Sequence, residues 1–183
     1  MRGSEGYHGI GMQHGRLLEH DLLGEVKIPN ELSDAEKRYM KYNEAVSWVK
    51  NHQPGESTNP RAPFANELRI ELLDLLGLER PEQFNKVHFY TAVGSHLDYF
   101  HGVDAFFEFD ADNNLPKGRV SLGVTLRDKS GDSLKTDIEI WAPADGIDET
   151  DKKFTSQVRK VAQAIVARLK GAAPEIVDLH TKH

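Results

Sequence analysis

A short stretch from His101 to Asp110, His-Gly-Val-Asp-Ala-Phe-Phe-Glu-Phe-Asp, places carboxylates inside an aromatic run that is typical of a buried β-strand. Side chains alternate between the two faces of a strand, so Asp104 and Phe106 would share one face and Phe107 would lie on the other. A strand that is apolar on both faces is usually central and covered by helices. A carboxylate there is costly unless it is paired, hydrogen-bonded or bound to a metal ion. Asp104 is therefore the leading candidate for a functional residue.

The same carboxylate has a structural interpretation, in which Asp104 caps the turn at Gly102 or pairs with an arginine. In the functional interpretation it holds a divalent cation such as Mg²⁺, which proteins bind through one or two carboxylates plus substrate phosphates. Glu108 is not the second ligand, because four residues of strand separate it from Asp104 by roughly 13 Å, whereas both ligands must lie about 2 Å from one ion. The partner must come from elsewhere in the chain.

Two helices are expected before this strand. Ser33-Asp-Ala-Glu36 matches a capping box, which predicts a helix from about residue 34 to residue 51 with one apolar stripe. A second helix is expected over residues 63–76, with Pro63 in its first turn and Gly77 just after its end. Glu67 lies beside the apolar face of this second helix, so it is either a solvated side chain or one that faces a site.

A strand is predicted at residues 86–93, which are rich in β-branched and aromatic residues. An irregular loop over residues 94–102 follows it and leads into the strand of Asp104. The loop carries His96, Asp98 and His101, so it brings further ligand types next to the leading candidate.

The turn from Asp110 to Gly118 predicts a hairpin, so the clean alternation of residues 119–127 indicates a strand antiparallel to that of Asp104. A further strand is predicted at 135–141 and a final amphipathic helix near 149–170. The fold class is therefore α/β, or α+β, with a small mixed sheet of about four strands flanked by helices.

Composition sets limits on the protein class. The chain has 183 residues, a net charge of −6, 38% hydrophobic residues and no cysteine. These values predict one folded domain at residues 33–183 after a flexible N-terminal segment at residues 1–32, and they exclude disulfides and thiolate metal sites. No apolar run is long enough to span a bilayer, so a cytoplasmic protein without a membrane partner is expected. The negative net charge argues against coating nucleic acid by bulk electrostatics.

The order of these motifs resembles the PD-(D/E)XK nuclease superfamily, from the Phe64-Ala-Asn-Glu-Leu-Arg helix through Leu97-Asp-Tyr-Phe-His-Gly-Val-Asp to Arg119-Val-Ser-Leu-Gly-Val-Thr-Leu. The resemblance covers about residues 63–141. It implies a restriction-endonuclease-like fold with a Mg²⁺ site that activates water for phosphodiester hydrolysis of nucleic acid. By position, Glu67 matches the helix glutamate of the family and Asp104 matches the aspartate of the first hairpin strand.

The second hairpin strand departs from the family pattern. Gly123 and Thr125 stand where the family places its second acid and its lysine. A metal site needs charged groups at one point in space rather than at fixed sequence positions, so charged residues elsewhere in the chain could replace the missing acid and lysine. Asp98 and Asp137 are the candidate metal ligands, and Lys135 is the candidate catalytic cation, with Lys129 and Arg127 as its alternatives.

Three functions remain open on the sequence alone. The first is a metal-dependent endonuclease that uses Asp104, Glu67 and a third acid. The second is a nuclease-like binding or assembly protein without catalysis, which the missing acid and lysine favour. The third is an α/β interaction module that associates through exposed aromatic residues. Histidine pairs at His96 and His101 and at His180 and His183 offer a weaker zinc or nickel alternative.

Overall fold

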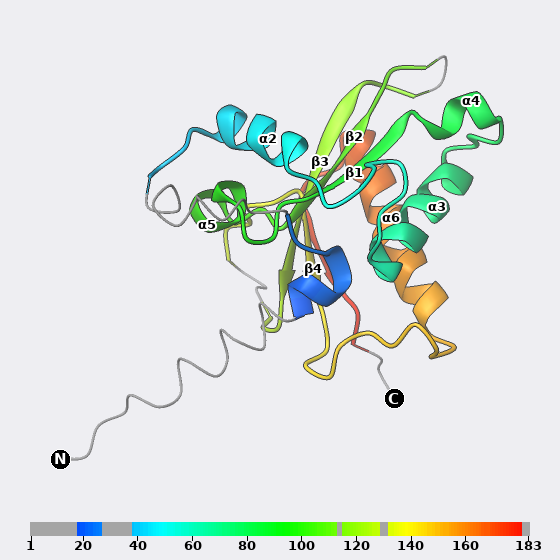
Figure 1. Ribbon diagram of the computed structural model, residues 1–183. Coiled ribbons are helices and arrows are strands. Elements are labelled where there is room, and N and C mark those ends of the chain that lie inside the picture. The colour runs from blue at the N-terminus through cyan, green and yellow to red at the C-terminus, as the bar shows by residue number, and fades with distance from the viewer. Residues whose placement is uncertain (1–17, 27–37, 113–114, 129–131, 181–183) are drawn as a thin grey trace.

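A computed structural model describes residues 18–26, 38–112, 115–128 and 132–180 (Figure 1). Residues 18–23 are helical. The elements that follow are α2 (Tyr42–Asn51), α3 (Pro63–Leu75), α4 (Pro81–Phe84), β1 (Val87–Thr91), α5 (His96–His101), β2 (Ala105–Phe109), β3 (Gly118–Thr125), β4 (Ile138–Trp141), α6 (Phe154–Leu169) and β5 (Glu175–Asp178).

The five strands form one mixed sheet in the order β1-β2-β3-β4-β5. β1, β2 and β3 are antiparallel neighbours, which confirms the hairpin predicted between β2 and β3. β4 and β5 each run parallel to the preceding strand in the sheet. The sequence predicted about four strands; it missed β5, because four residues after the final helix are too short to show a strand alternation.

Helices cover both faces of the sheet (Figure 1). α3 and α6 pack on one face, where Phe107 and Leu122 join the main hydrophobic core. α2 and α5 lie on the opposite face, where Phe106 contributes to a second, smaller core. The alternation predicted for the aromatic strand is therefore correct, because Phe106 and Phe107 are both fully buried on opposite faces.

The N-terminal part of the chain contributes to this core. Leu18, Leu22 and Leu23 are buried in the main core cluster. The sequence assigned residues 1–32 to a flexible segment outside the domain, and that expectation does not hold for residues 18–23. Leu18 and Leu22 are one turn apart on a helix, so a single turn suffices to bury both.

Two helices differ from their predicted bounds. α2 begins at Tyr42 rather than near residue 34, and the predicted capping box at Ser33 and Glu36 lies outside the described residues. The loop expected at 94–102 contains α5, whose first amides at Leu97 and Asp98 are capped by the Ser95 hydroxyl. A helix of six residues is too short to give a periodic signal in the sequence.

No helix within the described ranges is both long enough and apolar enough to cross a membrane.

Asp137 ties β3 to α6. Its Oδ2 accepts hydrogen bonds from the Ser121 amide and hydroxyl at 2.8 and 2.7 Å, and its Oδ1 accepts one from Arg168 Nε at 2.7 Å. Burial opposes ionisation of Asp137, but the bonds from Ser121 and the charge of Arg168 outweigh it and hold the pKa below its usual range. Asp137 thus forms a structural ion pair with Arg168 rather than belonging to an acidic cluster.

Replacing Asp137 with alanine should lower the free energy of unfolding by about 1–3 kcal/mol at pH 7, because the Ser121 amide and the partly buried Arg168 lose their partner. The native pKa is depressed, so this contribution is complete above the unfolded value of about 3.9 and is lost as pH falls through the native value. Urea unfolding at several pH values measures it. The control is Asp132→Ala, which breaks an exposed pair with Arg127 and should cost less than about 0.5 kcal/mol; equal losses would contradict the prediction.

Candidate metal site

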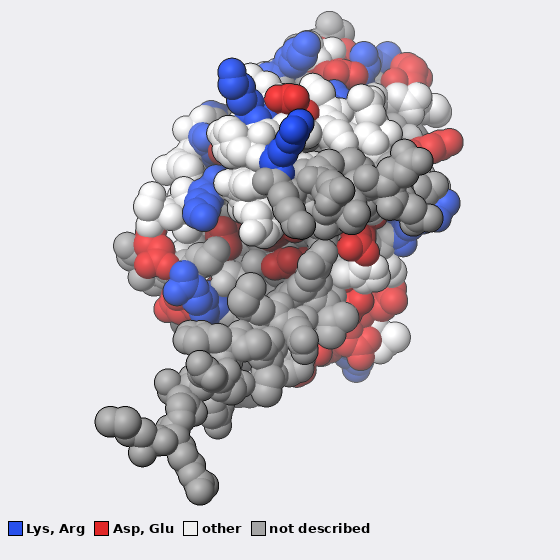
Figure 2. Space-filling model, turned by 60° about the vertical axis from the view of Figure 1, so that its left-hand side comes forward, with Lys and Arg blue, Asp and Glu red and all other residues white. Residues whose placement is uncertain are grey.

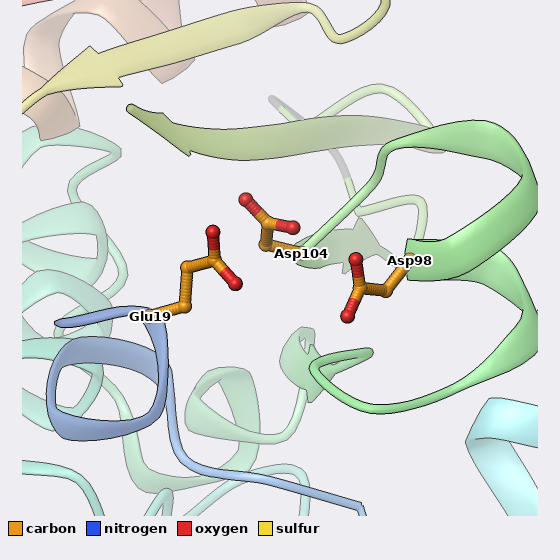
Figure 3. Close-up of side chains that lie close together, drawn as sticks. All are labelled: Glu19, Asp98 and Asp104. Carbon is orange, nitrogen blue, oxygen red and sulfur yellow. The ribbon is translucent and has the colours of Figure 1, made fainter. Parts of the chain in front are cut away.

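Three carboxylates from different elements converge at one end of the central strands (Figure 3). Glu19, Asp98 and Asp104 each offer one oxygen, and these oxygens all lie within 4.8 Å of one another. Glu19 comes from the helical segment 18–23, Asp98 from α5, and Asp104 from the residue just before β2. The fold therefore brings Glu19, from near the start of the chain, beside Asp98 and Asp104, which lie close together in the sequence.

The backbone of both neighbouring strands holds Asp104 in place. Its N–H donates to the Leu122 carbonyl on β3, and its carbonyl accepts from the Ala92 N–H just after β1. Its Oδ2 accepts a hydrogen bond of 2.7 Å from the Val124 N–H. The Asp104 carboxylate thus accepts a hydrogen bond from a β3 amide that would otherwise need a backbone carbonyl as its partner, and this bond orients the carboxylate.

Local turns place Asp98 beside Asp104. Asp98 lies in the first turn of α5, and its Oδ2 accepts a hydrogen bond from the Gly94 N–H at 2.8 Å. α5 ends at Gly102, whose φ of 66° is a left-handed conformation that a side chain would disfavour. This turn reverses the chain, so Asp104 follows α5 by only three residues and lies beside the helix it has just left.

The cluster carries an excess of negative charge. Burial raises the pKa of Asp104 well above its usual range, and the nearby charges of Glu19 and Asp98 raise it further. The hydrogen bond from Val124 opposes this rise without cancelling it. The buried carboxylate is therefore stabilised by either a proton or a cation.

The oxygen spacing fits a divalent cation. Two oxygens on one ion lie at most twice the metal–oxygen distance apart, which is about 4.6–5.2 Å for Ca²⁺ and about 4.0–4.2 Å for Mg²⁺. The oxygens of Glu19, Asp98 and Asp104 lie within 4.8 Å of one another, a separation of the order that one divalent cation can bridge. Hard cations prefer such an all-oxygen donor set.

Two of the residues selected from the sequence lie together here, namely Asp98 and Asp104. Glu67 does not: it is exposed on α3, because the buried stripe through Phe64 and Leu68 turns it to solvent. Asp137 is held by Ser121 and Arg168, as described above. The helix acid of the cluster is Glu19 instead.

Lys135 lies across the turn that leads to Asp104. A Cβ built on Gly102 would meet its Cδ at 3.0 Å and its Nζ at 3.8 Å. The side chain of Lys135 therefore runs over a residue two positions before Asp104, and Lys135 is exposed.

The other candidates from the sequence have local partners. No arginine among the described residues forms an ion pair with Asp104, and its hydrogen bond goes to β3 rather than to the Gly102 turn. The His101 ring contacts the Met40 carbonyl, and His96 packs beside Trp48. His180 contacts Asp178, and His183 lies outside the described residues.

Replacing Asp104 with asparagine should raise the melting temperature of the cation-free protein near pH 8. The amide oxygen can still accept from Val124, while the buried charge is removed. Because the native pKa of Asp104 is raised, wild-type stability falls as pH rises through that value, and the variant lacks this fall. Each kcal/mol corresponds to about 2–4 °C in a chain of this size. Thermal unfolding in chelator from pH 5 to pH 8 tests this, with Glu67→Gln as the control; a variant that melts below wild type at pH 8 would contradict it.

The sequence matches no family model, and no curated protein and no solved structure matches the chain. The chemistry of the site must therefore be argued from its own geometry.

Proposed function

We propose that this chain is a nuclease-like enzyme of the PD-(D/E)XK type that hydrolyses phosphodiester bonds of nucleic acid with a divalent cation, Mg²⁺ in the cell. The observation that carries the proposal is the convergence of Glu19, Asp98 and Asp104 around one point, with Asp104 buried. Three acids gathered at a low-dielectric point destabilise the cation-free protein, and such an arrangement is expected where a cation is bound.

The arrangement of elements supports the same proposal. The resemblance calls for a helix acid, an aspartate at the start of one hairpin strand and a positive group nearby. Glu19 from segment 18–23 takes the part assigned to Glu67, and Asp104 directly precedes β2 of the β2–β3 hairpin. The ammonium of Lys135 lies over the turn at Gly102. It would take the part of the family lysine, at whose position this chain has Thr125.

The chemistry follows from these positions. A bound divalent cation neutralises phosphate charge and lowers the pKa of a coordinated water. The three carboxylates fix the position of the cation, and Lys135 balances the negative charge that develops on the phosphate oxygens. The water would give a proton to solvent as its oxygen forms a bond to phosphorus, the bond from phosphorus to the sugar oxygen would break, and that oxygen would take up a proton from solvent.

Exposed aromatic side chains on α5 and beside it support nucleic acid as the substrate. Tyr99 follows Asp98 on α5 and is 78% exposed, and Tyr39 nearby is 67% exposed. Phe100 lies between them, with ring centroids 4.9 Å from Tyr99 and 5.6 Å from Tyr39. Aromatic faces of this kind stack unpaired bases.

Basic side chains contribute little by number. On the face that Figure 2 brings forward, the visible lysine and arginine side chains stand apart from one another among acidic and uncharged ones. With a net charge of −6, phosphate binding would depend on the cation and on Lys135 rather than on a broad basic surface.

Thr125, in the place of the family lysine, is the observation that favours the alternative of a nuclease-like binding protein without catalysis.

Calorimetric titration of the full chain with Mg²⁺, Mn²⁺ and Ca²⁺, together with cleavage of plasmid and of single- and double-stranded oligonucleotides, tests the proposal. Wild type should bind cations and cleave in Mg²⁺ or Mn²⁺. Asp104→Asn and Glu19→Gln should each lower cleavage by at least about 100-fold, because loss of a ligand exceeds the 10–100-fold effect of losing an outer-shell partner.

The matched control is Glu67→Gln, which changes an exposed glutamate of α3 and should leave both binding and cleavage unchanged. Cation binding without cleavage would favour the non-catalytic alternative. Absence of cation binding, or full cleavage by Asp104→Asn, would refute the proposed site.

A further inference from the structure

Gly123 lies where the two central strands meet the candidate metal site. Asp104 bonds to the backbone of Leu122 and Val124, the two residues that flank it on β3. On the other side of β3, Gly123 pairs in register with Glu139 of β4. Gly123 therefore separates two acidic residues on its neighbouring strands.

The backbone of Gly123 gives no reason for glycine, because its φ is not in the left-handed region that disfavours side chains. Glycine in a strand weakens the strand, and it often marks a place where another group approaches closely. That group is Glu139: a Cβ built on Gly123 would lie 2.7 Å from its Oε2 and 3.1 Å from its Cδ. The carboxylate of Glu139 thus occupies the space of a side chain at position 123.

The orientation of Glu139 fits the geometry of the sheet. Ile138 and Ile140 point into the main core, so Glu139 points to the opposite face of the sheet, the face on which α5 lies. Thr136 donates a hydrogen bond of 3.0 Å to Oε2 and holds the side chain over Gly123. Glu139 is only 3% exposed, and its charge is among those that raise the pKa of Asp104. Its oxygens lie outside the group that Glu19, Asp98 and Asp104 form, so Glu139 borders this group from β4.

We propose that Glu139 supplies a fourth carboxylate to the cation site, reaching from β4 into the space that Gly123 leaves on β3. This inference rests on the proposed function, since it concerns the same cation. The acid that the resemblance places on β3 is then present in space, although it comes from the next strand. Gly123 is the position that admits it, rather than a sign of a lost site.

Three variants of the full chain test this by calorimetric titration with Mn²⁺ and by melting in chelator. Glu139→Gln keeps the size of the side chain and should weaken Mn²⁺ binding by about tenfold or more. Gly123→Ala changes no charge but displaces the carboxylate, and it should weaken binding similarly. Combining Gly123→Ala with Glu139→Gln should weaken binding no more than either change alone, because both act on one carboxylate.

A relocation variant separates this role from a merely structural one. Gly123→Asp together with Glu139→Ala puts a carboxylate back over β3 from its own strand, and it should restore Mn²⁺ affinity to within a few-fold of wild type. Unchanged affinity in Glu139→Gln and in Gly123→Ala, while Asp104→Asn abolishes binding, overturns this inference and leaves the proposed function in place. Failure of the unmodified protein to bind Mn²⁺ overturns both.

Discussion

The structure depends on how it accommodates the buried negative charge of Asp104. Burial and two neighbouring carboxylates raise the pKa of this residue, and one amide of β3 is too little to offset them. A chain that gained nothing from this arrangement would be more stable with an uncharged residue there. The elements around Asp104 therefore make most sense as parts that hold several acids near one point.

The sheet makes that gathering feasible. Its antiparallel hairpin places Asp104 beside the middle of β3, and its parallel half places Glu139 on the other side of the same strand. α5 and the helical segment 18–23 then bring Asp98 and Glu19 to the same end. Asp137, although acidic and close in sequence to Glu139, is used differently: it is paired with Arg168 and holds β3 to α6.

Much of the fold could be predicted from the sequence, because α3, α6 and β3 each carry a periodic pattern long enough to read. The site was predictable only in part. Asp104 was found because a carboxylate within an aromatic strand is anomalous by itself. Glu19 was missed because one helical turn shows no period, and Glu67 was chosen instead because a stripe on α3 does not reveal which flank faces a site. The relation of Glu139 to Gly123 arises from strand pairing, which no local pattern encodes.

The parallel pairing of β3 and β4 has a consequence for when the candidate metal site can form during folding. If β4 slipped by one residue against β3, Glu139 would turn into the apolar core and Ile138 or Ile140 would face the acids. The candidate metal site, with Glu139 as proposed, would draw on the chain near its beginning, its middle and its later third, so it would form only after these parts have docked in the correct alignment. An ion that binds there would favour the correctly aligned sheet over misaligned alternatives, because it would bind only the folded state and so stabilise it.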